Sequence, residues 1–288
     1  MPVQGSLLRH EPGGATRLAA VIGSPVRHSL SPAMHNAAFD ELELDWVYVA
    51  LEVAPSEVAA AIAGMRAFGF GGLSVTIPHK AAVLGEVDET SEASAAVGAV
   101  NTVVPLGDGR LRGENTDVGG FLASLSDEGF DPAGRPCLVV GAGGAARAVV
   151  HALAGAGAAD VVVLNRSPRR AEEAAALAGP RGRVGVPADV AKVDLVVNAT
   201  PLGLAGAGGD AGALPLDPAA LRPGQLVVDL VPNPAVTPLL RAAGASGARV
   251  AGGLGMLVHQ GALAFELWTG RSAPLAVMRR AALHALGA

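Results

Sequence analysis

The sequence has very little cysteine, few aromatic residues and little charge. Its 288 residues include one cysteine, Cys137, which excludes an internal disulfide framework and makes a reducing cytoplasm the expected compartment. Aromatic residues make up 3% and charged residues 16% of the chain, with a net charge of -5 and no basic run. The sequence therefore has no electrostatic footprint for nucleic acid, and we expect none as a partner.

Long apolar runs are also missing, although apolar residues make up 50% of the chain. Mean hydropathy is +0.41, yet no stretch reaches the roughly 18 uninterrupted apolar residues of a membrane span. Residues 1–16 offer only Leu7 and Leu8 where a signal peptide needs an apolar region of about 7 to 15 residues. We expect a protein that is neither exported nor in the membrane, with 1–16 as a flexible tail.

What the sequence does contain is an alternation of short Val/Ile/Leu runs, Gly or Pro punctuation and Ala-rich stretches. This pattern predicts α/β units around mostly parallel sheets, and the length predicts two domains. The expected strands are 18–22, 46–51, 71–77, 99–106, 137–140, 161–165, 195–200 and 225–231. The expected helices are 31–42, 55–69, 79–86, 91–97, 148–158, 168–178, 261–270 and 273–286.

A glycine turn lies between an expected strand and an expected helix in the second half. It reads Gly141, Ala142, Gly143, Gly144, Ala145, Ala146, a variant of the G-x-G-x-x-G fingerprint. Glycines allow a sharp turn and a close approach to a pyrophosphate, which the N–H groups of the helix N-terminus hold. The alternative is an ordinary tight turn in a chain rich in Ala and Gly.

The residues after the next strand indicate which dinucleotide would bind. An NAD-binding domain places an acid there, about twenty residues beyond the glycines, whereas this chain has Asn165, Arg166, Ser167 and, three residues later, Arg170. Arginines pair with a 2'-phosphate, so NADP is favoured over NAD. The alternative is a solvated helix start, but cations oppose the dipole at that end of a helix.

Polar clusters in the first half coincide with expected strand or helix ends. They contain Ser29 and Ser31, Thr76 and Lys80, Asn101 and Thr102, and the run Asn115, Thr116, Asp117. Such a ring of hydroxyls and amides suits a polyhydroxylated small molecule. The serines also fit helix capping, and the asparagines also fit turns.

Lys80 and Asp117 are the candidate acid–base pair. Lys80 falls at the start of the helix expected over 79–86, where the positive dipole end would lower a lysine pKa toward neutrality, as a general acid requires. Asp117 ends the expected first domain and could pair with Lys80 in a cleft between domains. The alternative for Lys80 is an ordinary solvated surface lysine.

No metal site or nucleophile is expected. His28 and His35 are seven residues apart without a third ligand, and neither HExxH nor CxxC occurs. Cys137 begins an expected core strand and is interpreted as a small buried hydrophobe.

Taken in order, eight motifs resemble the shikimate dehydrogenase family from about Leu18 to the C-terminus. They are GSPVRHSLSP (23–32) with His35 and Asn36, SVTIPHK (74–80), GAVNT (98–102), NTD (115–117), GAGGAAR (141–147), NRS (165–167), NAT (198–200), and GLGML (253–257) with Gln260. Each motif alone is weak, but eight in the right order are highly specific.

The resemblance implies NADP-dependent, reversible reduction of 3-dehydroshikimate to shikimate on the route to chorismate and the aromatic amino acids. It implies catalysis by Lys80 with Asp117, and substrate binding by Ser29, Ser31, Thr76, Asn101, Asp117 and Gln260. It also implies cofactor contacts at Gly141, Ala142, Gly143, Gly144, Ala145, Asn165, Arg166, Ser167, Arg170, Thr200, Leu230, Gly253, Met256 and Glu92. The implied fold is α/β, with a substrate domain (17–117 and 253–288) to which C-terminal helices return, and a Rossmann-type NADP domain (118–252).

Three residues depart from the family pattern. Ser74 replaces an Asn, Val118 replaces a Gly, and Pro232 replaces a Tyr that borders the substrate in the family. Loss of that Tyr keeps two related substrates, quinate and an aminoshikimate, as alternatives. A nucleotide-sensing protein without turnover is a further alternative. The presence of both Lys80 and Asp117 argues against it. The sequence leaves monomer and homodimer equally open.

Overall fold

The computed structural model describes residues 11–204 and 215–287, which fall into two compact units. The first unit extends to Thr116 and resumes at Gly261, and the second extends from Asp117 to Gln260. The first unit is thus discontinuous in sequence, and helices α4 and α8 each run across one of its boundaries. The assignment of substrate binding to 17–117 and 253–288 and of NADP binding to 118–252 stays a prediction.

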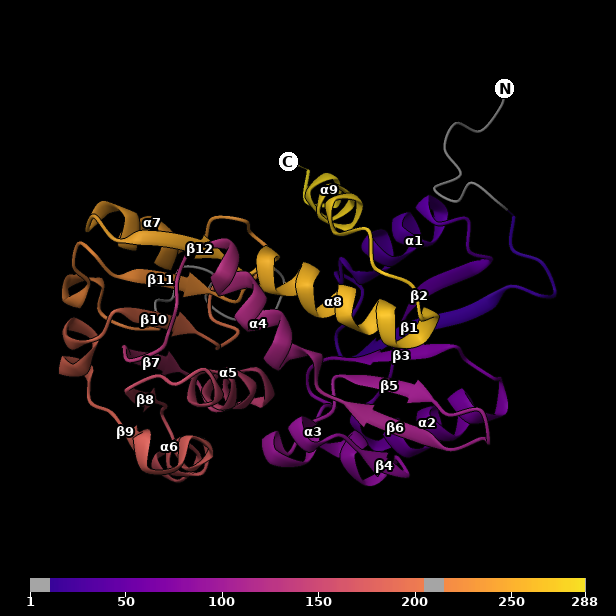
Figure 1. Cartoon of the computed structure of the whole chain (residues 1–288), viewed down its shortest axis with the longest axis horizontal. Helices are drawn as coiled ribbons and strands as arrows, with labels where there is room; N and C mark the ends of the chain where they lie inside the picture. The colour runs from indigo at the N-terminus through magenta and orange to yellow at the C-terminus, as the bar shows by residue number, and fades with distance from the viewer. Residues whose placement is uncertain (1–10, 205–214, 288) are drawn as a thin grey trace. The chain divides into compact units, whose positions relative to one another are not determined.

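The first unit is built on a mixed six-stranded sheet of order β2-β1-β3-β5-β6-β4 (Figure 1). Strands β2, β1 and β3 are parallel, whereas β5 is antiparallel to both β3 and β6. The strands are β1 (Arg17–Gly23), β2 (Trp46–Glu52), β3 (Gly72–Val75), β4 (Glu89–Thr90), β5 (Thr102–Pro105) and β6 (Leu111–Glu114). The helices are α1 (Ser31–Glu41), α2 (Val58–Ala67), α3 (Glu92–Val97), the end of α8 (Leu254–Thr269) and α9 (Leu275–Ala285), with 3-10 turns at Pro55–Glu57 and Ala82–Gly85.

The C-terminal helices are an integral part of this first unit. Helix α9 packs on α1, and the Trp268 indole N–H donates to the Val103 carbonyl of β5 at 3.1 Å. A Cβ added at Gly72 would lie 2.3 Å from the Trp268 ring, so this strand needs glycine to admit the indole. The predicted return of the C-terminal helices is confirmed.

The second unit is a fully parallel sheet of order β12-β11-β10-β7-β8-β9. Read along the chain this is the 3-2-1-4-5-6 order of a Rossmann fold. Its strands are β7 (Pro136–Val140), β8 (Asp160–Leu164), β9 (Gly182–Val184), β10 (Leu195–Asn198), β11 (Leu226–Asp229) and β12 (Arg249–Gly252). Its helices are α4 (Thr116–Asp127), α5 (Gly144–Gly155), α6 (Pro168–Ala175) and α7 (Pro238–Ala245), with 3-10 turns at Ala176–Arg181, Pro187–Lys192 and Pro218–Ala220.

Sheet burial explains the apolar excess. The central strands of the second unit are buried almost throughout, including Val139, Val162 and Val197. Parallel strands covered on both faces read as continuous apolar runs rather than alternating ones. No helix within the described ranges is long and apolar enough to span a membrane.

The structure differs from the expected elements in several places, including α8, which begins at Leu254 rather than at 261. The helix expected over 79–86 is a turn followed by the 3-10 helix Ala82–Gly85. Helix α4 was not expected: Asp117 does not end an element but lies in the first turn of this helix. Of the expected tail, residues 1–10 lie outside the described residues, and Gly13 to Thr16 form a turn in which the Thr16 hydroxyl donates to Asp45.

Candidate active site

The register of the first sheet brings several of the predicted substrate residues to one edge. Strands β1 and β3 end side by side, with Ile22 opposite Val75, so the loops carrying Ser29 and Thr76 leave the same edge. Strand β5 runs the other way and begins there with Thr102 opposite Ser74, while β6 ends there with Glu114 opposite Thr102. Residues far apart in sequence are gathered because β5 runs against β3 and β6 runs back alongside β5 to the same edge.

Asn101 lies at the centre of a buried hydrogen-bond network on this edge. Its Oδ1 accepts from the Thr116 N–H at 2.7 Å and from the Thr102 hydroxyl at 3.2 Å, and its Nδ2 donates to Thr116 Oγ1 at 2.9 Å. Asn101 is 2% exposed. The network fixes the backbone directly before Asp117, and Asp117 is itself buried.

Lys80 lies in a turn rather than at the start of a long helix. Its carbonyl accepts from the Val100 N–H at 2.8 Å, and the neighbouring His79 ring is buried with Nε2 2.8 Å from the Val53 carbonyl oxygen. The four-residue 3-10 helix that follows cannot supply the dipole expected for an α-helix. The dipole argument for Lys80 is therefore wrong, and the acid–base role predicted for this residue stays a prediction.

Ser29 and Ser31 flank the start of α1. Ser31 is buried as the first residue of the helix, and its N–H donates to Ser29 Oγ at 3.3 Å, so Ser29 satisfies one free N–H of the helix end. The next turn of α1 carries His35, stacked on Tyr48 with ring centroids 4.4 Å apart. Complete burial lowers the pKa of His35 to about 3, so this ring is neutral.

The glycine turn of the second unit has the geometry of a phosphate-binding turn. Gly141 follows β7 with φ +121°, and a Cβ there would lie 3.0 Å from the Ala199 carbonyl oxygen, so glycine is required. Gly143 is the N-cap of helix α5, which begins at Gly144, and a Cβ added at Gly143 would meet no atom within 4 Å. The turn combines the N-terminus of a helix with glycines that add no side-chain bulk, which fits a pyrophosphate.

The arginines predicted to bind the 2'-phosphate follow β8. Ser167 caps α6 by accepting from the Arg170 N–H at 3.4 Å, and Asn165 Nδ2 donates to the Ser167 carbonyl at 3.2 Å. Arg169 pairs with Glu173 at 2.9 Å, whereas Arg166 and Arg170 are exposed and form no ion pair with a carboxylate of the described residues. Two guanidinium groups are thus available to an anion.

The remaining predicted cofactor contacts lie at the carboxyl ends of β10, β11 and β12. A Cβ at Gly253 would come within 2.4 Å of the Leu230 carbonyl oxygen, so these two residues touch through their backbones. Thr200 donates its hydroxyl to Asn198 Oδ1 at 2.7 Å. Met256 is buried in the core of the second unit, packed with residues such as Phe121 and Val149.

Sequence reasoning missed a buried carboxylate at this edge, Asp229. It accepts from Asn198 Nδ2 at 2.9 Å, from the Val231 N–H at 3.2 Å and from the Thr237 hydroxyl at 2.6 Å. Burial raises the pKa of Asp229, and these hydrogen bonds oppose the rise. A strand that ends in Asp was the signal in the sequence. The network holds the backbone of Leu230 and the Asn198 partner of Thr200.

The structure also places three further predicted residues, and the roles of all the predicted site residues stay predictions. Glu92 is the exposed first residue of α3, Gln260 donates its Nε2 to the Leu257 carbonyl at 2.8 Å, and Asp117 belongs to the second unit. The pairing of Lys80 with Asp117 stays a prediction. Cys137 is buried as expected, and burial raises its thiol pKa to about 12.

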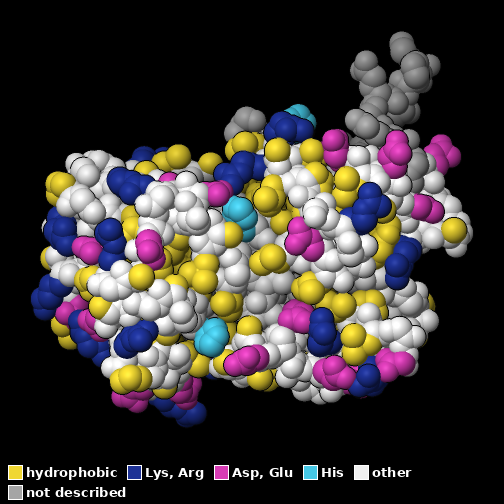
Figure 2. All heavy atoms as spheres, in the orientation of Figure 1, with side chains coloured by type: hydrophobic (Ala, Val, Ile, Leu, Met, Phe, Trp, Pro, Cys, Tyr) yellow, Lys and Arg dark blue, Asp and Glu magenta, His cyan; other side chains and the backbone are white. Residues whose placement is uncertain are grey.

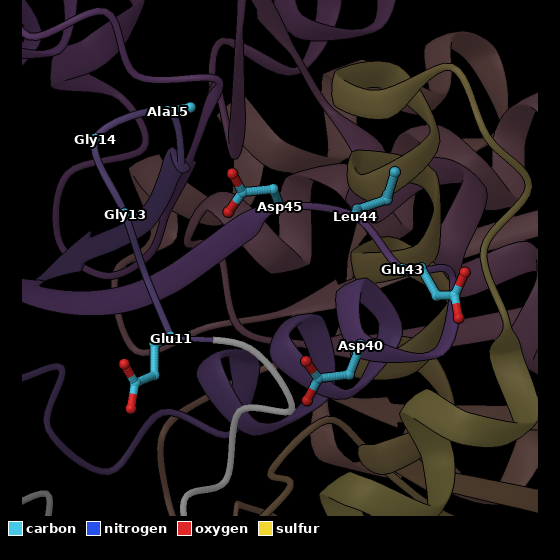
Figure 3. Close-up of a pocket in the computed structure, with 8 residues that line it drawn as sticks. All are labelled: Glu11, Gly13, Gly14, Ala15, Asp40, Glu43, Leu44 and Asp45. Atoms are coloured by element: carbon cyan, nitrogen blue, oxygen red, sulfur yellow. The ribbon is translucent and has the colours of Figure 1, made fainter.

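The pocket shown in Figure 3 lies away from every predicted site residue. It measures about 560 Å³ and is lined by Glu11, Gly13, Gly14, Ala15, Asp40, Glu43, Leu44 and Asp45. Its carboxylates point in different directions (Figure 3). Within the described ranges no group of His, Cys, Asp and Glu is arranged to hold a metal ion. On the face in Figure 2, acidic and basic side chains are interspersed, without a continuous band of either sign.

The strand order of the second unit, its glycine turn and the two exposed arginines define a dinucleotide-binding α/β protein. Family models match residues 21–103 (shikimate dehydrogenase substrate binding domain), 125–201 (shikimate / quinate 5-dehydrogenase) and 253–283 (shikimate 5'-dehydrogenase C-terminal domain). The chain belongs to the shikimate dehydrogenase family.

Relatives of known name resemble this chain in sequence and structure over nearly its whole length. The shikimate dehydrogenase (NADP(+)) of Moorella thermoacetica is 49% identical over 284 residues, 95% of each chain. The structure of shikimate 5-dehydrogenase from Thermus thermophilus in complex with NADP(H) and shikimate superimposes with a TM-score of 0.87 at 42% identity, covering 94% of this chain and 100% of the other. Quinate dehydrogenase from Corynebacterium glutamicum in complex with NAD gives a TM-score of 0.84 at 33% identity, covering 93% and 99%. The predicted family and the predicted two-domain α/β fold are confirmed.

Proposed function

We propose that this chain is an NADP-dependent oxidoreductase that reversibly reduces 3-dehydroshikimate to shikimate, on the route to chorismate and the aromatic amino acids. Membership of the family is the observation that carries this proposal, and the Moorella thermoacetica relative is named for shikimate and NADP(+). The chain retains Lys80 and Asp117, the residues that match the family's catalytic pair.

The second unit supplies the NADP site in this proposal. When bound, the nicotinamide supplies the hydride for the substrate's C3 carbonyl. The glycine turn at 141–145 and the N-terminus of α5 hold the pyrophosphate, and Arg166 and Arg170 hold the 2'-phosphate. Asn165, Ser167, Thr200, Leu230, Gly253 and Met256 complete the contacts, with Glu92 as a further one. The open backbone at Gly143 and the absence of ion pairs at both arginines support this assignment among the described residues.

The first unit supplies the acid and four of the six substrate contacts, and the second unit supplies Asp117 and Gln260. Lys80, as an ammonium, donates a proton to the oxygen of the developing alkoxide, and Asp117 accepts a hydrogen bond from the substrate and holds the Lys80 side chain. Substrate hydroxyls and carboxylate are bound by Ser29, Ser31, Thr76, Asn101, Asp117 and Gln260. Placement of three of these residues, Ser29, Thr76 and Asn101, on loops at one sheet edge supports the assignment. In this proposal the protein orients the substrate and supplies the charged groups of Lys80 and Asp117.

A quinate or aminoshikimate dehydrogenase is the second candidate, because of Pro232. This residue follows Val231 in the segment between β11 and α7, where the family resemblance places a tyrosine beside the substrate. Proline removes both the phenol hydroxyl and the backbone N–H at that position. A relative of known structure is a quinate dehydrogenase.

One absorbance assay at the NADPH band tests both candidates. Shikimate and quinate are each offered with NADP and with NAD, and the initial rates are compared. We expect the fastest NADPH formation with shikimate and NADP. A preference for quinate would establish the second candidate, and absence of turnover with every pair would favour a nucleotide sensor.

The cellular setting is part of the same proposal. We place the protein in the cytoplasm, as monomer or homodimer and without a nucleic-acid or membrane partner. The single, buried cysteine supports a reducing compartment.

A further inference from the structure

Asn115 is a buried amide at the sheet edge to which no role has been given so far. It follows β6, is 6% exposed, and donates from Nδ2 to the Ala99 carbonyl at 2.8 Å. A carbonyl can only accept, so the orientation of the amide is fixed by this bond. Its Oδ1 is buried and has no hydrogen-bond partner among the described residues.

An unpaired buried oxygen is costly, and an apolar residue of similar size would avoid the cost. The amide is therefore explained by the bond that its Nδ2 makes. That bond goes to the Ala99–Val100 peptide group, which is also hydrogen-bonded to the main chain of the proposed acid, Lys80.

The Ala99–Val100 peptide connects Asn115 to Lys80. Its carbonyl accepts from Asn115 Nδ2, and its N–H donates to the Lys80 carbonyl at 2.8 Å. Two hydrogen bonds through one planar group thus tie the Asn115 side chain to the Lys80 main chain. Asn115 is also two residues before Asp117, in the segment that Asn101 holds through the Thr116 N–H.

We infer that Asn115 is a positioning residue, which fixes the main chain of Lys80 relative to the segment that continues into Asp117. This inference depends on the proposed function, because it takes Lys80 and Asp117 as the acid–base pair. Asn115 acts through the Ala99–Val100 peptide. Its loss misplaces the Lys80 main chain and leaves the NADP-binding residues of the second unit untouched.

The test compares Asn115→Ala and Asn115→Asp with the wild type and with Asn36→Ala. Aspartate keeps the size of asparagine but, when ionised, cannot donate to Ala99. Asn36 is the matched control: its Nδ2 donates to the Tyr48 carbonyl at 2.9 Å and its Oδ1 accepts from the Tyr48 N–H at 2.7 Å, in the same unit. Each protein is assayed for kcat, both KM values, NADPH affinity, and the kinetic isotope effect with NADPH deuterated at the transferred position.

We expect kcat to fall by about 10- to 100-fold in both Asn115 variants, as for a misplacement of about 1 Å. The KM for NADPH should stay within about twofold, since a positioning defect concerns the transition state. The isotope effect on kcat should rise, because chemistry becomes more rate-limiting. Asn36→Ala should lose stability but keep kcat within about twofold.

Three results would overturn the inference. They are wild-type kcat in both Asn115 variants, a fall in kcat matched by Asn36→Ala with an unchanged isotope effect, and a raised KM for 3-dehydroshikimate at unchanged kcat. The last would make Oδ1 a substrate contact instead. If Asn115→Ala does not fold, the isosteric Asn115→Asp carries the test. Failure of the wild type to turn over shikimate would count against the proposed function, whereas an active wild type with unaffected variants counts against Asn115 alone.

Discussion

Replacing Gly253 by alanine tests the backbone contact on which the proposed nicotinamide end of the site depends. A Cβ at Gly253 would lie 2.4 Å from the carbonyl oxygen and 2.5 Å from the carbonyl carbon of Leu230, and 2.8 Å from the carbonyl carbon of Val231. All three are backbone atoms, so no side chain can rotate away. Relief requires that the Leu230–Val231 segment or the start of α8 moves.

The free energy of unfolding should fall by about 2 kcal/mol. Overpacking of this kind costs about 1–3 kcal/mol. The segment is tied by the Leu230 N–H to the Asn198 carbonyl at 3.0 Å and by the Val231 N–H to Asp229 at 3.2 Å, so movement also weakens hydrogen bonds worth about 1 kcal/mol each. Since Leu230 is a proposed cofactor contact, we expect the NADPH dissociation constant to rise about tenfold, equivalent to about 1.4 kcal/mol.

Urea denaturation and NADPH fluorescence titration measure the two effects. Gly244→Ala is the matched control, because Gly244 lies in α7 of the same unit and a Cβ there meets no atom within 4 Å. Alanine in a helix should stabilise by up to about 1 kcal/mol and leave NADPH binding unchanged. A Gly253→Ala protein as stable as the wild type, with unchanged NADPH affinity, would refute the argument from the close backbone approach.

Three further predictions concern the acid, the phosphate and a buried histidine. Lys80→Ala should lower kcat about 10²- to 10⁴-fold with little change in the KM for substrate, and normal turnover would remove the assignment. Arg166→Ala should weaken the binding of NADPH far more than the binding of NADH. Arg169 is the control, because its side chain is 88% exposed and pairs with Glu173, and Arg169→Ala should leave the affinity for both cofactors unchanged. Equal losses of affinity for both cofactors in Arg166→Ala would contradict the 2'-phosphate argument. The pKa of His35 falls from 6.5 to about 3 on folding, so between these two pH values His35 is protonated in the unfolded chain and neutral in the folded chain. The free energy of unfolding that is present above pH 6.5 is therefore lost progressively as the pH falls toward 3. Between pH 7.5 and 5 the loss of unfolding free energy due to His35 amounts to about 2 kcal/mol. Urea denaturation at the two pH values should show that His35→Phe abolishes this loss, and an unchanged pH dependence in the variant would contradict the prediction.

Elements with a strong local signal could be predicted from the sequence. Strand β7, the turn at Gly141 and helix α5 were recognisable because a buried parallel strand, a glycine turn and an Ala-rich helix succeed one another directly. Strand β6 and helix α4 were not. The strand sequence LRGE is only four residues long with a single large apolar side chain, and its pairing with β5 and β4 is tertiary.

The turn at Lys80 shows how tertiary contacts override a local pattern. The run after Pro78 favoured a helix, yet the structure ties the Lys80 carbonyl to the Val100 N–H and sets the His79 ring against the Val53 carbonyl. These bonds come from a strand end and a loop that are close only in the folded unit. No local propensity could reveal them.

The sequence by itself determined which chemical groups this protein has and in which order: a glycine turn, arginines in place of an acid, and a lysine and an aspartate among hydroxyls and amides. Only the tertiary structure decided which of them meet. Lys80, Asn101 and Asn115 share one sheet edge because β5 begins beside the end of β3 and runs the other way, and β6 then returns the chain to that edge. The charge state of His35 was likewise decided by burial, because a ring enclosed by Tyr48, Phe265 and Trp268 has no water to stabilise a proton.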